Sequence, residues 1–313
     1  MQKNVCVMYG DELARYHFGE THPFGPKRYW AFKEEFEHRG LQDKVNLCSP
    51  ATCTSQQLSL FHNRDYIDKV KMLSATGKGY LDCGDTPALK GIYEAACIIA
   101  GTTLKAVDLI MQKQYQHIFS PIAGLHHASR DSAAGFCVVN DCAIAIEYLR
   151  QQYHVRRIAY IDIDAHHGDG VFYAFEDDPE ICIVDFHQDG SSLYPGTGFI
   201  NETGINNAVG TKLNIPLPAH STNKTAMALW QSAEDFITSF KPEFILLQCG
   251  ADSIAGDPIT QLELSSDFHA HVTARLSLLA GKYSQGRLLA MGGGGYNLNN
   301  IKTAWNDVIE QLL

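Results

Sequence analysis

Five short apolar runs, separated by longer segments of helical periodicity, restrict the fold more than any other feature of this sequence. The runs cover residues 117–120, 157–164, 181–187, 244–250 and 287–293. Each is apolar at most positions, as expected of strands that are buried on both faces of a parallel sheet. The longer segments predict helices over 91–112, 140–153, 224–240, 266–284 and 298–312. Strands that alternate with helices predict an α/β fold with a central, mostly parallel sheet and helices on both faces.

Composition gives no reason to divide the chain, so a single domain over residues 1–313 is expected. The formal net charge of −10 argues against non-specific binding to nucleic acid or to an anionic membrane surface. The longest apolar runs fall well short of the roughly 20 residues of a membrane span. Nine cysteines without a CxxC pair, and no secretory signal pattern, predict reduced thiols in a cytoplasmic protein. The sequence pattern predicts no particular oligomeric state.

Polar clusters follow four of the predicted strands. They read "GLHHA" (124–128), "DIDAHHGDG" (162–170), "CGADSIAGD" (249–257) and "GGGGYN" (292–297). In open α/β sheets, ligands bind outside the carboxyl ends of the strands. Four strand ends that each deliver polar groups to the same edge therefore predict a functional site there.

The second cluster indicates a metal site. Residues two apart in an extended segment point the same way, so Asp162, Asp164 and His166 are expected to share a face. Asp252, at the end of another strand, is a candidate third ligand beside Asp164 and His166. Carboxylate oxygens and an imidazole nitrogen suit a divalent metal such as Zn²⁺, and three protein ligands with an open position are typical of a catalytic site. The competing interpretation, a helix cap or a salt bridge, fits one aspartate better than a cluster of them.

The remaining clusters offer acid–base and hydrogen-bonding groups. His126 and His127 could supply a general base and an electrostatic or acid partner, each oriented by a carboxylate such as Asp162 or Asp169. The adjacent histidines could equally form a polar turn, and the glycine run a flexible one. Glycines also let the backbone approach a ligand closely, and here they lead to Tyr296, whose hydroxyl could stabilise a developing oxyanion. The GxG patterns lack the strand–helix context of a nucleotide-binding fingerprint.

Taken together, "GLHHA", "GFCVVND", "DIDAHHGDG", "YPGTG", "QCGADSIAGDP" and "GGGGYN" resemble the ordered motifs of the zinc-dependent histone deacetylase family. The "DIDAHHGDG" version is similar to the acetoin-utilisation-type bacterial branch. "HPFGPKRY" near the start and "DCGDTPALKG" at 82–91 extend the likeness over nearly the whole chain. The resemblance implies the arginase/deacetylase fold.

The resemblance also implies roles for individual residues. Asp164, His166 and Asp252 would bind one zinc ion per chain. Asp162 then moves behind His126, which is mainly electrostatic, and Asp169 stands behind His127, the general base. Tyr296 would polarise the acyl carbonyl, and Arg28 would lie buried below the site. The substrate tunnel and its rim would be formed by Gly135, Phe136, Tyr194, Ile259 and Asp85. Potassium would bind near the "DID" segment, with Asp162 as one of its ligands.

By resemblance, the activity would be removal of acetyl or other acyl groups from lysine side chains of a protein or peptide, by attack of metal-activated water on the amide. Fe²⁺ suits the same ligands. His167 is left without a catalytic role and is expected to be structural. Two departures from the family pattern concern the substrate. Leu125 stands where many eukaryotic members have Trp, which implies a different pocket below the zinc. The apolar Ile259 occupies a position where polyamine-directed relatives place an acidic residue.

Three alternatives compete with this interpretation. A deacetylase of acetylpolyamines or other small amides would use the same chemistry. A dinuclear manganese ureohydrolase on the same fold would need another aspartate at the position of Gly168 in "DAHHG". A catalytically inactive acyl-lysine reader or scaffold would be expected to lack a ligand or the tyrosine, but all matched positions are present.

Overall fold

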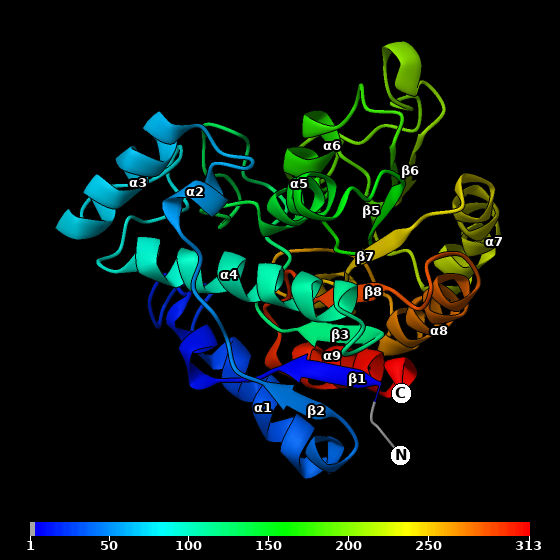
Figure 1. Ribbon diagram of the computed structural model, residues 1–313, viewed down its shortest axis with the longest axis horizontal. Helices are drawn as coiled ribbons and strands as arrows, with labels where there is room; N and C mark the ends of the chain where they lie inside the picture. The colour runs from blue at the N-terminus through cyan, green and yellow to red at the C-terminus, as the bar shows by residue number, and fades with distance from the viewer. Residues whose placement is uncertain (1–3) are drawn as a thin grey trace.

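A computed structural model describes residues 4–313, which form one α/β domain around an eight-stranded sheet (Figure 1). The strand order is β2-β1-β3-β8-β7-β4-β5-β6, and every neighbouring pair is parallel. The strands are β1 (Val5–Met8), β2 (Asn46–Cys48), β3 (His117–Ser120), β4 (Ile158–Asp162), β5 (Ile181–Gln188), β6 (Lys212–Leu217), β7 (Phe244–Gln248) and β8 (Leu288–Met291).

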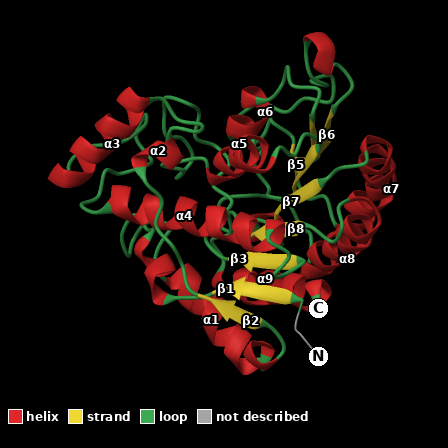
Figure 2. Cartoon of the chain, viewed as in Figure 1, coloured by secondary structure: helices red, strands yellow, loops and turns green. Residues whose placement is uncertain are grey.

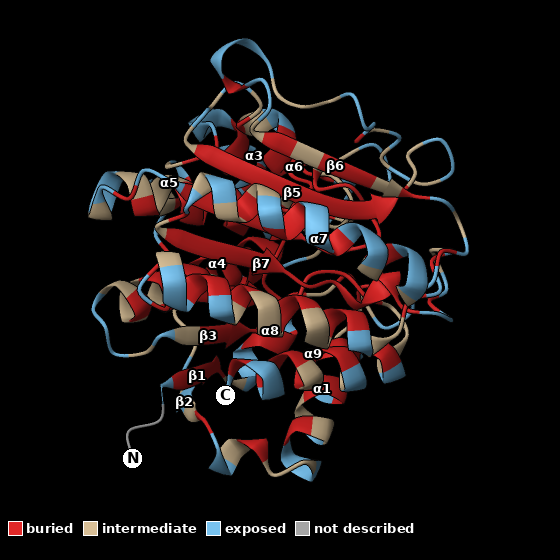
Figure 3. Cartoon of the chain, turned by 90° about the vertical axis from the view of Figure 1, so that its right-hand side faces the viewer, coloured by how far each residue is buried: buried red, intermediate tan, exposed pale blue. Residues whose placement is uncertain are grey.

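Helices cover both faces of this sheet (Figure 2). They are α1 (Lys27–His38), α2 (Ser55–Leu58), α3 (Arg64–Thr76), α4 (Ile92–Met111), α5 (Asp141–Tyr153), α6 (Asp169–Ala174), α7 (Asn223–Phe240), α8 (Ser266–Tyr283) and α9 (Leu298–Leu312). Helices α1, α9, α8 and α7 pack side by side over one face, in front of the strands in Figure 3, and α4 packs with α5 on the other. The central strands are buried between these two layers, as expected of a parallel sheet.

The predicted α/β fold with a parallel central sheet is confirmed. All five predicted strands and all five predicted helices form, with ends that differ by up to two residues. The sheet is larger than expected because β1, β2 and β6 were not predicted. β1 was missed although its four residues are all apolar; β2 has three residues and is partly exposed, and β6 contains Lys212 and Asn214 within its run. Short or interrupted runs carry too little apolar pattern to indicate a strand.

The strand β4 ends at Asp162, two residues before the predicted end. Its neighbour β7 likewise ends at Gln248, before the predicted Gly250. Beyond these points the backbone leaves the sheet, and the next side chains turn into the space above its carboxyl edge. The residues that carry chemistry therefore belong to the loops that follow the strands, held by a rigid sheet.

No helix within residues 4–313 combines the length and apolar character needed to cross a bilayer.

Candidate metal centre and active site

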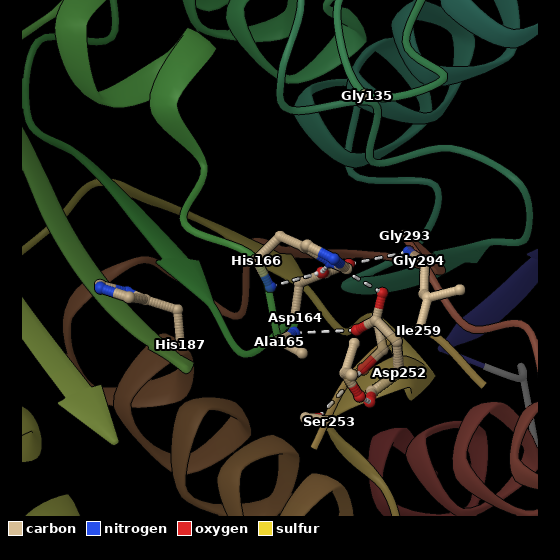
Figure 4. Close-up of polar contacts among 12 residues, drawn as sticks. Gly135, Asp164, Ala165, His166, His187, Asp252, Ser253, Ile259, Gly293 and Gly294 are labelled. Atoms are coloured by element: carbon tan, nitrogen blue, oxygen red, sulfur yellow. Dashed lines mark hydrogen bonds and ion pairs between the residues drawn. The ribbon is translucent and has the colours of Figure 1, made fainter. Parts of the chain in front are cut away.

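Three buried side chains converge at the carboxyl edge of the sheet (Figure 4). Asp164 and His166 follow β4, and Asp252 follows the adjacent β7. One potential ligand atom from each lies within 4.8 Å of the others, and all three residues are buried. No other group of three or more His, Cys, Asp or Glu side chains in the described part of the chain meets the same criterion.

Backbone and side-chain donors fix both carboxylates. Asp164 Oδ2 accepts hydrogen bonds from Gln248 Nε2 and from the backbone N–H of Gly294, each at 2.9 Å. Asp252 Oδ1 accepts one from the Ala165 N–H at 2.8 Å. Each carboxylate therefore keeps an oxygen directed toward His166, whose Nδ1 lies 3.1 Å from Asp164 Oδ1 and 3.3 Å from Asp252 Oδ2.

This arrangement fits a divalent metal. Asp252 Oδ2 is buried without a hydrogen-bond partner, which is costly unless a cation satisfies it. Burial and the adjacent Asp164 raise the pKa of Asp252 to about 7. Although burial opposes it, the two carboxylates raise the pKa of His166 to about 10. Protons at these ligand atoms would have to leave when a metal binds, so we expect proton release to accompany binding.

Two histidine–aspartate pairs stand beside this cluster. His126 Nδ1 lies 2.8 Å from Asp162 Oδ2, and His127 Nδ1 lies 2.7 Å from Asp169 Oδ1. The two Nε2 atoms face each other at 3.0 Å. Since each Nδ1 faces a carboxylate and one Nε2 must donate to the other, this geometry indicates three protons on the two rings.

The surroundings divide these protons unequally. Burial lowers the pKa of His126, but Asp162 and Asp164 outweigh it and raise the pKa to about 9. Burial together with the charge on His126 lowers the pKa of His127 to about 4. His126 is therefore the charged ring and His127 the neutral one, whose Nε2 accepts a hydrogen bond from His126 Nε2. Neutral imidazole is the form that a general base requires.

Tyr296 follows the glycine run after β8, and hydrogen bonds fix the backbone at this residue and just before it. Its backbone N–H donates to Asp257 Oδ2 at 2.8 Å. Arg28 donates to the carbonyls of Gly295 at 2.7 Å and Gly293 at 2.5 Å, which fixes the turn from below. Burial and the charge on Asp252 raise the pKa of the Tyr296 hydroxyl well above its usual range, so it stays protonated and can donate a hydrogen bond.

A strained turn forms one wall above the site. Gly135 and Phe136 both have left-handed backbones, with φ values of +52° and +66°. Left-handed backbone is unfavourable for a phenylalanine, so neighbouring groups must hold it. The Thr86 hydroxyl accepts from the Phe136 N–H at 3.1 Å, and the Tyr16 hydroxyl donates to the Phe136 carbonyl at 2.8 Å. A Cβ on Gly135 would lie 2.4 Å from the His127 ring, so a larger residue cannot occupy this position without displacing the histidine.

Tyr194 forms the opposite wall, and its ring centroid lies 5.2 Å from that of His127. An open cavity of about 450 Å³ is lined by Gly135, by Tyr194 and by the loop that carries Asp82 and Asp85. Asp82 Oδ1 accepts three backbone N–H groups of this loop, including that of Asp85. Ile259 is half-buried and lies beside the metal cluster in Figure 4.

The structure thus brings the sequence-predicted residues together around one site. Asp162 does not join the metal cluster but contacts His126 through Oδ2 and the Tyr160 hydroxyl at 2.6 Å. His167 points elsewhere, with Nδ1 2.8 Å from the Thr197 hydroxyl. Sequence reasoning missed Gln248, the donor to Asp164. Its polar side chain directly after a buried apolar run was the available signal.

It also missed the residues that support the histidine pair and the two walls above the site. Asn140 Nδ2 donates to the backbone carbonyls of His126 at 3.2 Å and Ala128 at 2.9 Å. Tyr16 and Thr86 approach the Phe136 turn from two distant segments. No short-range pattern identifies such contacts, because they depend on how segments meet in space.

Comparison with known proteins agrees with this geometry. The sequence pattern that defines the histone deacetylase domain family matches residues 22–312 of this chain. The acetoin utilization protein AcuC of Bacillus subtilis is 36% identical over 312 residues, covering 97% of this chain and 80% of that protein. AcuC of Staphylococcus xylosus is 33% identical, covering all of this chain and 83% of that protein.

A solved structure of the HD domain of HDA15 matches with a TM-score of 0.91 at 25% identity, covering all of this chain and 88% of that one. The family match spans nearly the whole chain, and the relatives share about a third of its residues. The chain belongs to the histone deacetylase family.

Proposed function

We propose that this protein is a zinc-dependent hydrolase that removes acetyl or other acyl groups from lysine side chains. The observation that carries the proposal is the buried Asp164–His166–Asp252 cluster, beside which stand a neutral His127 and a protonated Tyr296. Membership of a deacetylase family supports the same reaction class. Zinc suits the ligand set, which would also accept Fe²⁺.

Different residues of the chain would carry out the separate steps of amide hydrolysis. His127 accepts a proton from the attacking water at Nε2, and Asp169 holds the ring in the required tautomer. Tyr296 donates a hydrogen bond to the carbonyl oxygen as negative charge develops on it. An imidazolium of the histidine pair then protonates the leaving lysine amine. The products are a free amine and a carboxylate.

Asp164, His166 and Asp252 would hold the metal. When bound, it would supply a Lewis acid and lower the pKa of water at the site. Potassium near the segment 162–164 stays a prediction from the family resemblance. The Asp162 carboxylate already accepts from Tyr160 and from the Asp164 N–H, so a potassium site would have to include these contacts.

Metal content would separate this proposal from a dinuclear ureohydrolase. Such an enzyme would need a further carboxylate at position 168, but a Cβ on Gly168 would lie 2.7 Å from Asp162 Oδ2 and would displace the carboxylate that contacts His126. Asp169, the next residue, contacts His127 instead. We therefore expect one tightly bound metal ion per chain, and two manganese ions would contradict the proposal.

An acetylpolyamine is the second candidate substrate. Asp82 and Asp85 line the cavity at the tunnel mouth and could face a cationic amine. The apolar Ile259 favours the neutral stem of an acylated lysine instead. Both candidates place the same acyl amide at the cluster, so a direct comparison of substrates decides between them.

The test is a substrate panel assayed with protein reloaded with one equivalent of zinc. Acetyl-lysine peptides, longer-chain acyl-lysine peptides and acetylpolyamines should be compared with and without a chelator. We expect chelator-sensitive turnover, with peptides used at higher kcat/KM than polyamines. Absence of turnover on every substrate would favour a non-catalytic acyl-lysine-binding protein.

Tyr296→Phe provides the matched variant, because it removes only the hydroxyl. Loss of one oxyanion donor typically costs about 3 kcal/mol in the barrier, so turnover should fall about a hundredfold or more. Zinc content should not change, because Tyr296 is outside the ligand cluster. Near wild-type turnover in this variant would refute the role of the tyrosine.

A further inference from the structure

A third histidine–aspartate pair lies on β5, away from the metal cluster. Asp185 Oδ1 and His187 Nδ1 are 2.7 Å apart, and both side chains are fully buried. His187 Nε2 lies 2.8 Å from the carbonyl oxygen of Gly198. Both ring nitrogens thus face groups that only accept hydrogen bonds, so the ring must carry two protons and a positive charge. Figure 4 shows His187 to the side of the cluster, with its ring directed away from Asp164 and His166.

His167 joins this pair from the loop after β4. Its ring centroid lies 4.9 Å from that of His187, and its Nδ1 contacts the Thr197 hydroxyl at 2.8 Å. Gly198 rests on both rings. A Cβ there would lie 2.5 Å from His187 Nε2 and 2.7 Å from the His167 ring. The two histidines therefore form a platform under residues 197 and 198.

The platform connects to both sides of the active site. Thr197 and Gly198 end the segment that carries Tyr194, the wall beside His127. At the other end, Asp185 Oδ2 accepts the N–H of Gly168 at 2.9 Å, and Gly168 directly precedes Asp169. One buried ion pair thus contacts the loop of the wall and the segment that holds the general base.

We propose that Asp185, His187 and His167 are positioning residues that fix Tyr194 and thereby set the width of the tunnel above the catalytic histidines. Their role in turnover rests on the proposed function, whereas their role in holding the loop does not. Burial lowers the pKa of His187, but Asp185 outweighs it and raises it, in agreement with a charged ring. Tyr194 itself is about half exposed, so anchoring at residues 197 and 198 matters for its position.

Gly198→Ala and Gly210→Ala form a matched pair for the test. Both glycines have left-handed backbones, with φ values of +82° and +83°, so alanine adds similar backbone strain at each. Only at Gly198 would the new methyl group meet the histidine rings, because nothing lies within 4 Å of a Cβ on Gly210. The difference between the variants therefore reports the contact with the platform.

The first measurement is amide hydrogen exchange of the segment 192–198 in zinc-loaded protein. We expect Gly198→Ala to raise its exchange rate about tenfold or more, with β3 unchanged, and Gly210→Ala to leave it within about twofold. Thr197→Val should also raise exchange, whereas Thr197→Ser, which keeps the hydroxyl, should not. Equal exchange in the two glycine variants would overturn the proposal.

The second measurement is acyl-peptide turnover in a double-mutant cycle with Tyr194→Ala. Gly198→Ala should raise KM at least fivefold in the wild-type background but less than twofold when Tyr194 is already absent. An equal effect in both backgrounds would show that the platform does not act through Tyr194. If no acyl substrate is turned over while exchange still rises, the proposed function fails and the loop anchor stands.

Discussion

A methyl group placed between the two metal-binding carboxylates should abolish tight zinc binding. Gly294 approaches the cluster closely, and a Cβ there would lie 2.1 Å from Asp252 Oδ2 and 2.7 Å from Asp164 Oδ2. Its φ is outside the left-handed region, so alanine is acceptable to the backbone. The consequence of Gly294→Ala is therefore confined to the space that the methyl group takes.

The size of the effect follows from these distances. Real Cβ contacts essentially never fall below 3.0 Å, so Asp252 Oδ2 must retreat by about 0.9 Å and Asp164 Oδ2 by about 0.3 Å. Metal–ligand distances tolerate deviations of only about 0.2 Å. Losing the geometry of one ligand and straining a second should weaken zinc binding at least a hundredfold, or about 3 kcal/mol.

Zinc affinity measured by competition with a chromogenic chelator would test this prediction. Gly281→Ala is the matched control, because Gly281 lies in α8 with open space around it. That variant should bind zinc as the wild type does and gain about 0.5–1 kcal/mol of stability from helix propensity. The reasoning is refuted if Gly294→Ala remains folded by circular dichroism and binds zinc within threefold of the control.

Two further predictions concern the support of the histidine pair. Asp169→Asn replaces a carboxylate that fixes the His127 tautomer, and we expect kcat to fall about a hundredfold with zinc still bound; a loss of less than threefold would contradict its role. His62 accepts the Asn140 N–H at 2.9 Å, and burial lowers its pKa from 6.5 to about 4. As the pH falls, His62 therefore binds a proton in the unfolded chain before it does so in the folded one. The free energy of unfolding should then fall by up to about 3 kcal/mol between pH 6.5 and pH 4. Urea unfolding across this range should show a weaker pH dependence in His62→Gln, and equal slopes would exclude His62 as the source.

The sequence was sufficient for five of the eight strands and for the three residues of the metal cluster. β4 and β7 are continuous apolar runs, and Asp164, His166 and Asp252 follow them directly, so the rule for strand ends places the three side chains at one edge. Motif resemblance then separated Asp162 from the ligands, which the spacing alone could not do. The side chain of Asp162 contacts His126 because the backbone leaves the sheet after this residue.

Other parts of the site depend on tertiary contacts without a local signal. Thr86 supports Phe136 from fifty residues away, and Tyr16 does so from the N-terminal region. Asp185 and His187 lie in the otherwise apolar strand β5. Two polar residues within such a run indicate only that the apolar pattern is interrupted, and they predict no particular contact. His187 contacts Gly198 only because the following loop folds back over the edge of the sheet.

The position of β8 has a consequence for how this protein is made. The strand β8 comes last in the sequence but lies between β3 and β7, in the middle of the sheet. Until residues 288–291 leave the ribosome, the strands β2-β1-β3 and β7-β4-β5-β6 have no partner that joins them. Nascent chains that stop before β8 should therefore expose two apolar sheet edges and depend on chaperones. The metal ligands would be translated well before the strand that completes their surroundings.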